Sequence, residues 1–172
     1  MIIANALKRL FTGLTADCTF LGNPKPNTPI QFWYGDQKEL IAWITQRKNL
    51  VNYPLIWYVL NEFTEFQGVY ETNARLVIMQ DTQLLPLNDW RNSNSYENVL
   101  FPIWEVVKDK LITKQQVEVM GDMQTMFKLN TIPNYGVEPI SLTDSSKESI
   151  NVDLVDCLVI DFKIRINVNC IN

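Results

Sequence analysis

The residues of this chain with the clearest chemical potential are Asp161 and Lys163, which lie two positions apart near the carboxyl end. Side chains two apart on a β-strand point to the same face, so this carboxylate and this ammonium group would lie side by side. A carboxylate in that position can hold Mg²⁺, while the lysine orients a water molecule or stabilises negative charge in the transition state. The spacing is therefore compatible with metal-assisted hydrolysis.

Metal-dependent nucleases use such an acidic-x-lysine pair, but they also need a second metal-binding carboxylate. Several carboxylates could serve equally well, namely Asp153, Asp156, Glu118 and Asp122. The alternative is a solvent-exposed strand face on which Asp161 and Lys163 are followed by Arg165, Asn167 and Asn169. Because fragments of motifs recur by chance, the sequence favours the exposed strand face over a small nuclease.

Other kinds of active site lack the residues they need. The sequence contains no histidine, so Ser-His-Asp and Cys-His catalytic groups are excluded in their usual form. It has no Cys/His cluster for zinc and no glycine-rich phosphate loop of the Walker or dinucleotide pattern. We therefore expect a protein that is not an enzyme and that uses no cofactor and no metal.

Two groups of side chains could bind a ligand instead. Glu62, Glu65 and Glu71 could hold a cation, although scattered acids in an acidic protein usually lie on solvated faces. Five aromatic side chains could stack on bases or sugars, but most lie in apolar runs that favour packing in a core. They are Trp33, Tyr34, Trp57, Tyr58 and Trp104.

Four residues are candidates for contact with a partner protein. Trp90 and Arg91 are adjacent, and these residue types are enriched in interface hot spots; the alternative is that they stabilise local packing. Asn134 and Tyr135 belong to residues 130–151, which are rich in Pro, Gly, Asn, Ser and Asp. We expect this segment to form a long projecting loop that could reach a neighbour.

Composition limits the class of protein. The 172 residues are 47% hydrophobic, which is enough for one domain with a single core, and the net charge of −4 argues against a surface that follows nucleic-acid phosphates. Cys18, Cys157 and Cys170 are unclustered and odd in number, so we expect reduced thiols in a cytosolic product. The amino terminus lacks a secretory pattern, and no apolar run approaches the roughly twenty residues of a membrane helix.

Apolar residues at helical spacing predict three helices. The first ends near Gly13, and the second is opened by Asp36 and Glu39 as a capping box. The third covers residues 96–111, where Pro102 is tolerated in a first turn or as a kink.

Strands are predicted at residues 31–34, 55–60, 69–79, 117–129 and 160–170. The last alternates apolar and polar residues without a break and would reach about 36 Å, which is long for a strand. Residues 117–129 form either one long strand or a hairpin broken near Gly121 and Asp122. Between these elements, residues 18–29 are expected to be a loop or an edge, and residues 84–94 a polar linker.

These elements predict a single α+β domain over residues 1–172. We expect helices packed on one face of a largely antiparallel or mixed β-sheet, with long strands and an extended loop.

Four stretches are distinctive in combination. They are Tyr53-Pro54-Leu55-Ile56 at a strand entry, the linker at residues 88–96, Phe101-Pro102-Ile103-Trp104 in a helix, and the closing strand from Val155 to Phe162. In this order, after a leading helix and a capped second helix, they resemble the tail-terminator and head-tail joining (neck) proteins of tailed bacteriophages, especially neck proteins of phages with Bacteroidetes-like hosts.

The resemblance implies a helix-covered sheet and a homo-oligomeric ring, commonly a hexamer, without a catalytic site. Such a ring caps the tail tube in the virion neck, contacts the tail-tube protein and the head connector, and lets DNA pass through its lumen without specific binding. Another neck or head-completion adaptor of the same junction is the alternative within structural proteins.

Overall fold

The structure, a computed structural model, describes residues 2–46, 53–82, 88–113, 117–122, 125–135 and 155–167. Within these ranges the helical segments are α1 (Ile2–Phe11), α2 (Gln37–Gln46), α3 (Asn88–Arg91), the π-helical η1 (Asn92–Leu100) and α4 (Phe101–Thr113). The strands are β1 (Thr15–Phe20), β2 (Asn23–Pro29), β3 (Gln31–Gly35), β4 (Leu55–Val59), β5 (Thr64–Phe66), β6 (Val69–Asp81), β7 (Val117–Met120), β8 (Lys128–Tyr135) and β9 (Val155–Asn167).

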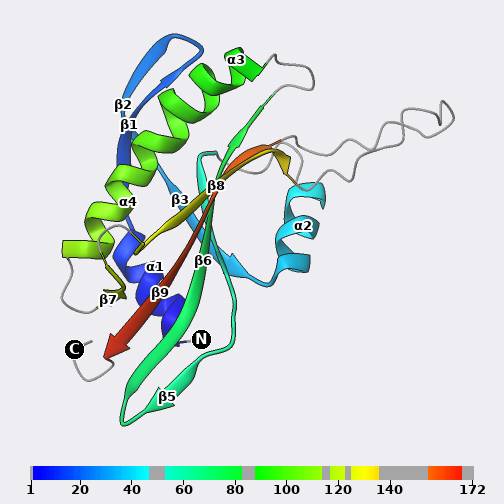
Figure 1. Cartoon of the computed structure of the whole chain (residues 1–172). Coiled ribbons are helices and arrows are strands. Elements are labelled where there is room, and N and C mark those ends of the chain that lie inside the picture. Colours follow the sequence, from blue (N-terminus) through cyan, green and yellow to red (C-terminus); the bar gives the residue numbers. More distant parts are fainter. Residues whose placement is uncertain are drawn as a thin grey trace, which may run out of the picture.

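Seven strands form one sheet in the order β3-β4-β6-β9-β7, with β5 also paired to β6 and β8 also paired to β9. The pair β3–β4 is parallel and the other pairs are antiparallel. The central strands β6 and β9 pair along their whole length and cross the middle of the molecule (Figure 1). The predicted α+β class, with a largely antiparallel sheet and long strands, is therefore confirmed.

Strand β9 confirms the predicted alternation at the carboxyl end. Ile160, Phe162, Ile164 and Ile166 point to one face of the sheet and are buried. The strand begins earlier than predicted, at Val155, and its first residues are buried on both faces. Residues 168–170 of the predicted strand lie outside the described residues.

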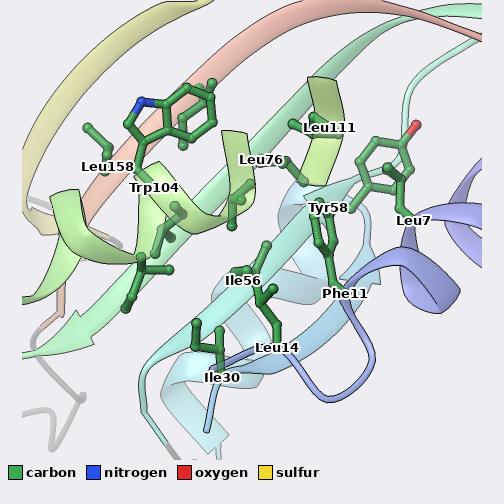
Figure 2. Close-up of a cluster of buried hydrophobic side chains, with 14 of the residues drawn as sticks. Leu7, Phe11, Leu14, Ile30, Ile56, Tyr58, Leu76, Trp104, Leu111 and Leu158 are labelled. Carbon is green, nitrogen blue, oxygen red and sulfur yellow. The ribbon is translucent and has the colours of Figure 1, made fainter. Parts of the chain in front are cut away.

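The face of the sheet to which Ile160 points, which we call the first face, is covered by α1, η1, α4 and the β1–β2 hairpin. Figure 2 shows how side chains from α1 and α4 meet those of the sheet. The contributing residues include Leu7, Phe11, Trp104 and Leu111 from the helices and Ile56, Tyr58, Leu76 and Leu158 from the strands. All of these side chains are buried, so this layer forms the main core.

Helix α2 packs on the opposite face, which we call the second face. Its Leu40 and Ile44 belong to a separate buried cluster with Val77, Met79 and Cys157, whose side chains alternate with those of the first face. The prediction that the helices pack on one face is therefore wrong for α2. The physical reason is that this end of β4, β6 and β9 is apolar on both sides, so both sides must be covered.

Two predicted helix boundaries are confirmed. Helix α1 ends at Phe11, and Gly13 follows with a φ of 73°, a left-handed conformation that glycine adopts without strain. The capping box opens α2: Asp36 Oδ1 accepts the Glu39 N–H, and Glu39 Oε2 accepts the Asp36 N–H, each at 2.7 Å.

Residues 18–29, expected to be a loop or an edge, form most of the β1–β2 hairpin. Leu21 and Gly22, both with positive φ, connect the strands. The proline-rich strand β2 is tolerated because it is an edge strand paired only with β1, so Pro24 removes no donor from a second neighbour.

The predicted linker at residues 84–94 is wrong from residue 88 onward, where α3 and η1 are helical; residues 84–87 lie outside the described part of the chain. Ser95 and Tyr96 are buried against the first face, and this packing outweighs the turn-forming composition. Pro102 is the second residue of α4. The residue before it, Phe101, donates its backbone N–H to the Tyr96 carbonyl across the π-helical turn. A missing N–H is tolerated at such a junction.

Strands β7 and β8 lie one after the other along the same edge of β9, opposite Lys163–Ile166 and Val155–Asp161 respectively. The prediction of strand structure across residues 117–129 is confirmed at both ends, with the expected interruption at Gly121. The expected loop at residues 130–151 is wrong for residues 130–135, which belong to β8, and its remainder lies outside the described residues.

Candidate functional site

The second face is apolar at one end and charged at the other. Val77, Val159 and their neighbours lie under α2, whereas further along the same two strands the side chains on this face are polar and uncovered. We call this uncovered part the open face. Its charged residues are Glu71 and Arg75 of β6, Asp161, Lys163 and Arg165 of β9, Glu118 of β7, and Lys128 of β8, which lies opposite Asp161.

Asp161 is held by a two-point ion pair. It lies directly opposite Arg75 in the β6–β9 register. The Arg75 Nε donates to Asp161 Oδ1 at 2.7 Å, and Nη2 donates to Oδ2 at 2.9 Å. A paired guanidinium and carboxylate of this geometry is the strongest kind of side-chain ion pair, and it occupies both oxygens that a metal ion would need.

Lys163 and Arg165 share one carboxylate. Arg165 Nη2 lies 2.6 Å from Glu71 Oε1, whereas Lys163 Nζ lies 3.4 Å from Glu71 Oε2. Arg165 also contacts Glu118, at 3.3 Å. The hydrogen bond from Arg165, followed by that from Lys163, lowers the pKa of Glu71, and the same contact with Glu71 raises the pKa of Arg165. Lys163 is thus the less completely paired of the two cations.

The predicted Asp161 and Lys163 pair does share one face, but the carboxylates nominated as metal partners do not gather around it. Asp156 points to the first face, 2.9 Å from Arg91 Nε, and Glu118 contacts Arg165. Asp153 lies outside the described residues. Within the described ranges no three Cys, Asp or Glu side chains are placed to hold a metal ion. The arrangement agrees with the exposed strand face that the sequence favoured.

The three glutamates considered for a cation have different partners. Glu71 pairs with Lys163 and Arg165, and Glu65 Oε1 accepts the Gly68 N–H at 2.9 Å. Glu62 is exposed, and its backbone carbonyl, not its carboxylate, accepts the Thr72 hydroxyl at 2.6 Å. They stabilise the β5–β6 hairpin and the open face.

A groove runs along the open face, and the sequence analysis did not predict it. It consists of three adjoining cavities of about 550, 280 and 420 Å³. The first two share Asn73 and Lys163, and the second and third share Thr64 and Glu71. One wall is formed by the chain around β5, and the other by Met120, Thr125 and Met126. The alternation of polar residues in β6 is the signal that could have indicated it.

Most of the aromatic candidates belong to the core, as the packing alternative predicts. Trp57, Tyr58 and Trp104 are buried, and burial raises the pKa of Tyr58 to about 12. Trp33 is the exception, with 46% of its surface exposed. Its ring lies 6.4 Å from that of Trp43, which lies 5.8 Å from that of Trp57, so the three rings form a chain beside α2.

The four interface candidates have different environments. Arg91 is buried and ion-paired with Asp156, so it serves local packing and the prediction that it faces a partner is wrong. Trp90 is half-buried, and its carbonyl accepts a hydrogen bond from Asn94 Nδ2 at 2.9 Å. The backbone of Asn134 and Tyr135 belongs to β8, with Tyr135 opposite Val155, but their side chains lie outside the described part of the structure.

Comparison of the chain with known protein families, with curated protein sequences and with solved structures finds no match. No helix among the described residues has the length and apolar character needed to cross a membrane.

Proposed function

We propose that this chain is a virion structural protein of the head-tail junction of a tailed bacteriophage. As a tail-terminator-type subunit, it assembles with copies of itself into a ring that caps the tail tube and contacts the head connector. The ring is located in the virion neck, and a hexamer is the expected stoichiometry because it is common in the family that the sequence resembles.

The fold agrees with what this resemblance implies. The mixed, mostly antiparallel sheet is covered by helices, and its two central strands have 13 residues each. Antiparallel strands of this length, packed on a continuous core, make a stiff plate. A stiff subunit suits a ring that must keep its diameter while DNA passes under pressure.

The observation that carries the proposal is that the plate has two different sides. The first face is hidden under helices, whereas the second face leaves the groove of the open face uncovered. Different surfaces on opposite sides of one subunit permit head-to-tail contacts between identical copies, and such contacts close into a ring when the rotation between copies closes.

Electrostatics agrees with a lumen that does not hold DNA. The net charge of the chain is −4, and Arg75, Lys163 and Arg165 of the open face are paired with carboxylates. A ring of such subunits repels passing phosphates more than it binds them.

The proposal is tested with the full-length chain and tail tubes assembled from the tube protein encoded in the same genome. We expect light scattering after size-exclusion chromatography to give a mass several times that of one chain, and electron microscopy to show rings at one end of the tubes. A chain that remains monomeric at all concentrations and binds no tube would contradict the proposal. Rings that bind the connector but no tube would indicate the adaptor alternative.

The nuclease alternative needs its own assay, in which supercoiled plasmid is incubated with the chain and Mg²⁺ or Mn²⁺. We expect no nicking above that of a buffer control. Nicking by the wild-type chain that disappears in Asp161→Ala, with the fold intact by circular dichroism, would replace the structural proposal by an enzymatic one.

A further inference from the structure

We propose that the groove of the open face receives helix α4 of a second copy of this chain. The inference rests on the proposed function and deepens it, because it names the two surfaces through which neighbouring copies in the ring meet.

The two surfaces lie on opposite sides of the subunit. Helix α4 packs on the first face through Ile103, Val107 and Leu111, whereas the groove lies on the second face. Figure 1 shows α4 on one side of the central strands and α2 on the other. A contact between them uses a different patch on each copy and leaves one of each patch available for the next copy. Such contacts form a ring when the rotation between copies closes.

The side of α4 that faces solvent presents a continuous stripe. Phe101, Glu105, Asp109 and Ile112 are exposed and recur at helical spacing, with 55% of the Ile112 surface accessible. At 1.5 Å per residue the stripe is about 17 Å long. The groove follows β6 from Val69 to Arg75, which is about 20 Å at the rise of a strand. The lengths of the two surfaces therefore match.

The ends of the stripe are apolar, and so are the ends of the groove. Phe101 and Ile112 would meet Met120 and Met126 at one end and Phe66 at the other. Methionine side chains adapt to irregular apolar partners. Phe66 is 73% exposed in the single chain, so a large aromatic surface is available to be buried on association.

One pair of charges in the middle is complementary. Asp109 makes no ion pair with any residue in the described ranges, and Lys163 has only the 3.4 Å contact with a glutamate that Arg165 already holds at 2.6 Å. An Asp109 carboxylate of the neighbouring copy would complete the pairing of Lys163. A nucleic acid is a poorer occupant, because the carboxylates Glu71, Asp161 and Glu118 lie among the cations of this face and hold Arg75, Lys163 and Arg165 in ion pairs.

The test is a charge exchange in the full-length chain, read by sedimentation velocity over a range of concentrations. We expect Lys163→Glu and Asp109→Lys each to weaken self-association by about tenfold or more, because like charges then face each other. The double variant places the opposite charges in contact again and should regain most of the association. Lys38→Glu, which changes an exposed lysine on α2 by the same charge, is the matched control and should associate as the wild type does.

The apolar contact gives a second, independent measurement. Ile112→Ser removes an exposed side chain and should leave the melting temperature almost unchanged while it weakens association by about tenfold. If the wild type forms rings and the single charge reversals, or Ile112→Ser, leave ring formation unchanged, the groove is not the interface, although the proposed function stands. If the wild type is monomeric at every concentration, both proposals fail together.

Discussion

Arg91 and Asp156 form an ion pair in the interior, with Nε and Oδ1 2.9 Å apart and side chains that are 9% and 0% exposed. Arg91 ends the short helix α3, and Asp156 lies near the start of β9 on the first face. The pair therefore ties the helical layer to the central strand at the end of the sheet where both faces are covered.

Because this pair is buried, removing one charge leaves the other without compensation in a medium of low polarity. We predict that Asp156→Asn lowers the free energy of unfolding by about 3 kcal/mol. Urea denaturation followed by circular dichroism measures this directly. A loss below about 1 kcal/mol would mean that the Arg91 guanidinium reaches solvent or another acceptor in the protein.

The ion pair between Arg75 and Asp161 should behave differently, although its geometry is better. Its side chains are 48% and 30% exposed, so water competes for both charges. We predict that Asp161→Asn changes the free energy of unfolding by less than about 1 kcal/mol. The same denaturation experiment, run beside Asp156→Asn, checks the contrast; equal losses in the two variants would contradict the assignment of one pair to the core and the other to the surface.

Glu71 should make stability depend on pH in the acid range. Hydrogen bonds from Arg165 and Lys163 lower its pKa below the ordinary value of 4.5, so the unfolded chain binds its proton first as pH falls. The contribution of this group is fully present above about pH 4.5 and is lost as pH falls through the lowered pKa of the folded state. We predict that Glu71→Gln reduces the slope of stability against pH below pH 4.5, measured by urea denaturation at several pH values. A slope equal to that of the wild type would contradict the pairing of Glu71 with Arg165 and Lys163.

The strands and caps could be predicted because they depend on near neighbours. The alternation around Ile160 and Ile164 needs only the two-residue period of a strand, and the Asp36 and Glu39 capping box needs only a spacing of three. These features are decided within one short stretch of chain.

The site could not be predicted in the same way, because it depends on which residues meet across the sheet. Arg75 and Asp161 are 86 positions apart, and only the β6–β9 register shows that they pair. The periodicity of α2 shows which side of the helix is buried. It does not show which face of the sheet that side packs against. Tertiary packing likewise decides that residues 88–94 are helical despite their polar composition.

The two cysteines within the described residues should react slowly in the native protein. Cys18 and Cys157 are unpaired and buried, and burial raises the pKa of both thiols, so little thiolate forms at pH 8. We predict that iodoacetamide at pH 8 labels both at least about tenfold more slowly in the native state than in 6 M guanidinium chloride. Mass spectrometry of the peptides reads each cysteine separately. Fast native labelling of Cys157 would place it outside the cluster under α2.

Gly35 is required where β3 ends and the α2 cap begins. A Cβ atom at this position would lie 2.6 Å from Cζ2 of the buried Trp57 and 2.6 Å from Oε2 of Glu39, the oxygen that accepts the Asp36 N–H. The Trp57 ring has little room to move, because its Nε1 donates to the Gly35 carbonyl at 3.3 Å and its other side meets Trp43.

We therefore predict that Gly35→Ala lowers the free energy of unfolding by about 2 to 3 kcal/mol, since an added methyl group in a packed site forces its neighbours to shift. Gly13→Ala is the comparison, because nothing lies within 4 Å of its Cβ position and only its φ of 73° opposes the change, at a cost of about 1 kcal/mol. The tryptophan fluorescence of the chain should change in Gly35→Ala, because Trp57 must shift, and not in Gly13→Ala. If Gly35→Ala is as stable as the wild type, the β3–α2 junction must be looser than the contacts of Trp57 and Glu39 require.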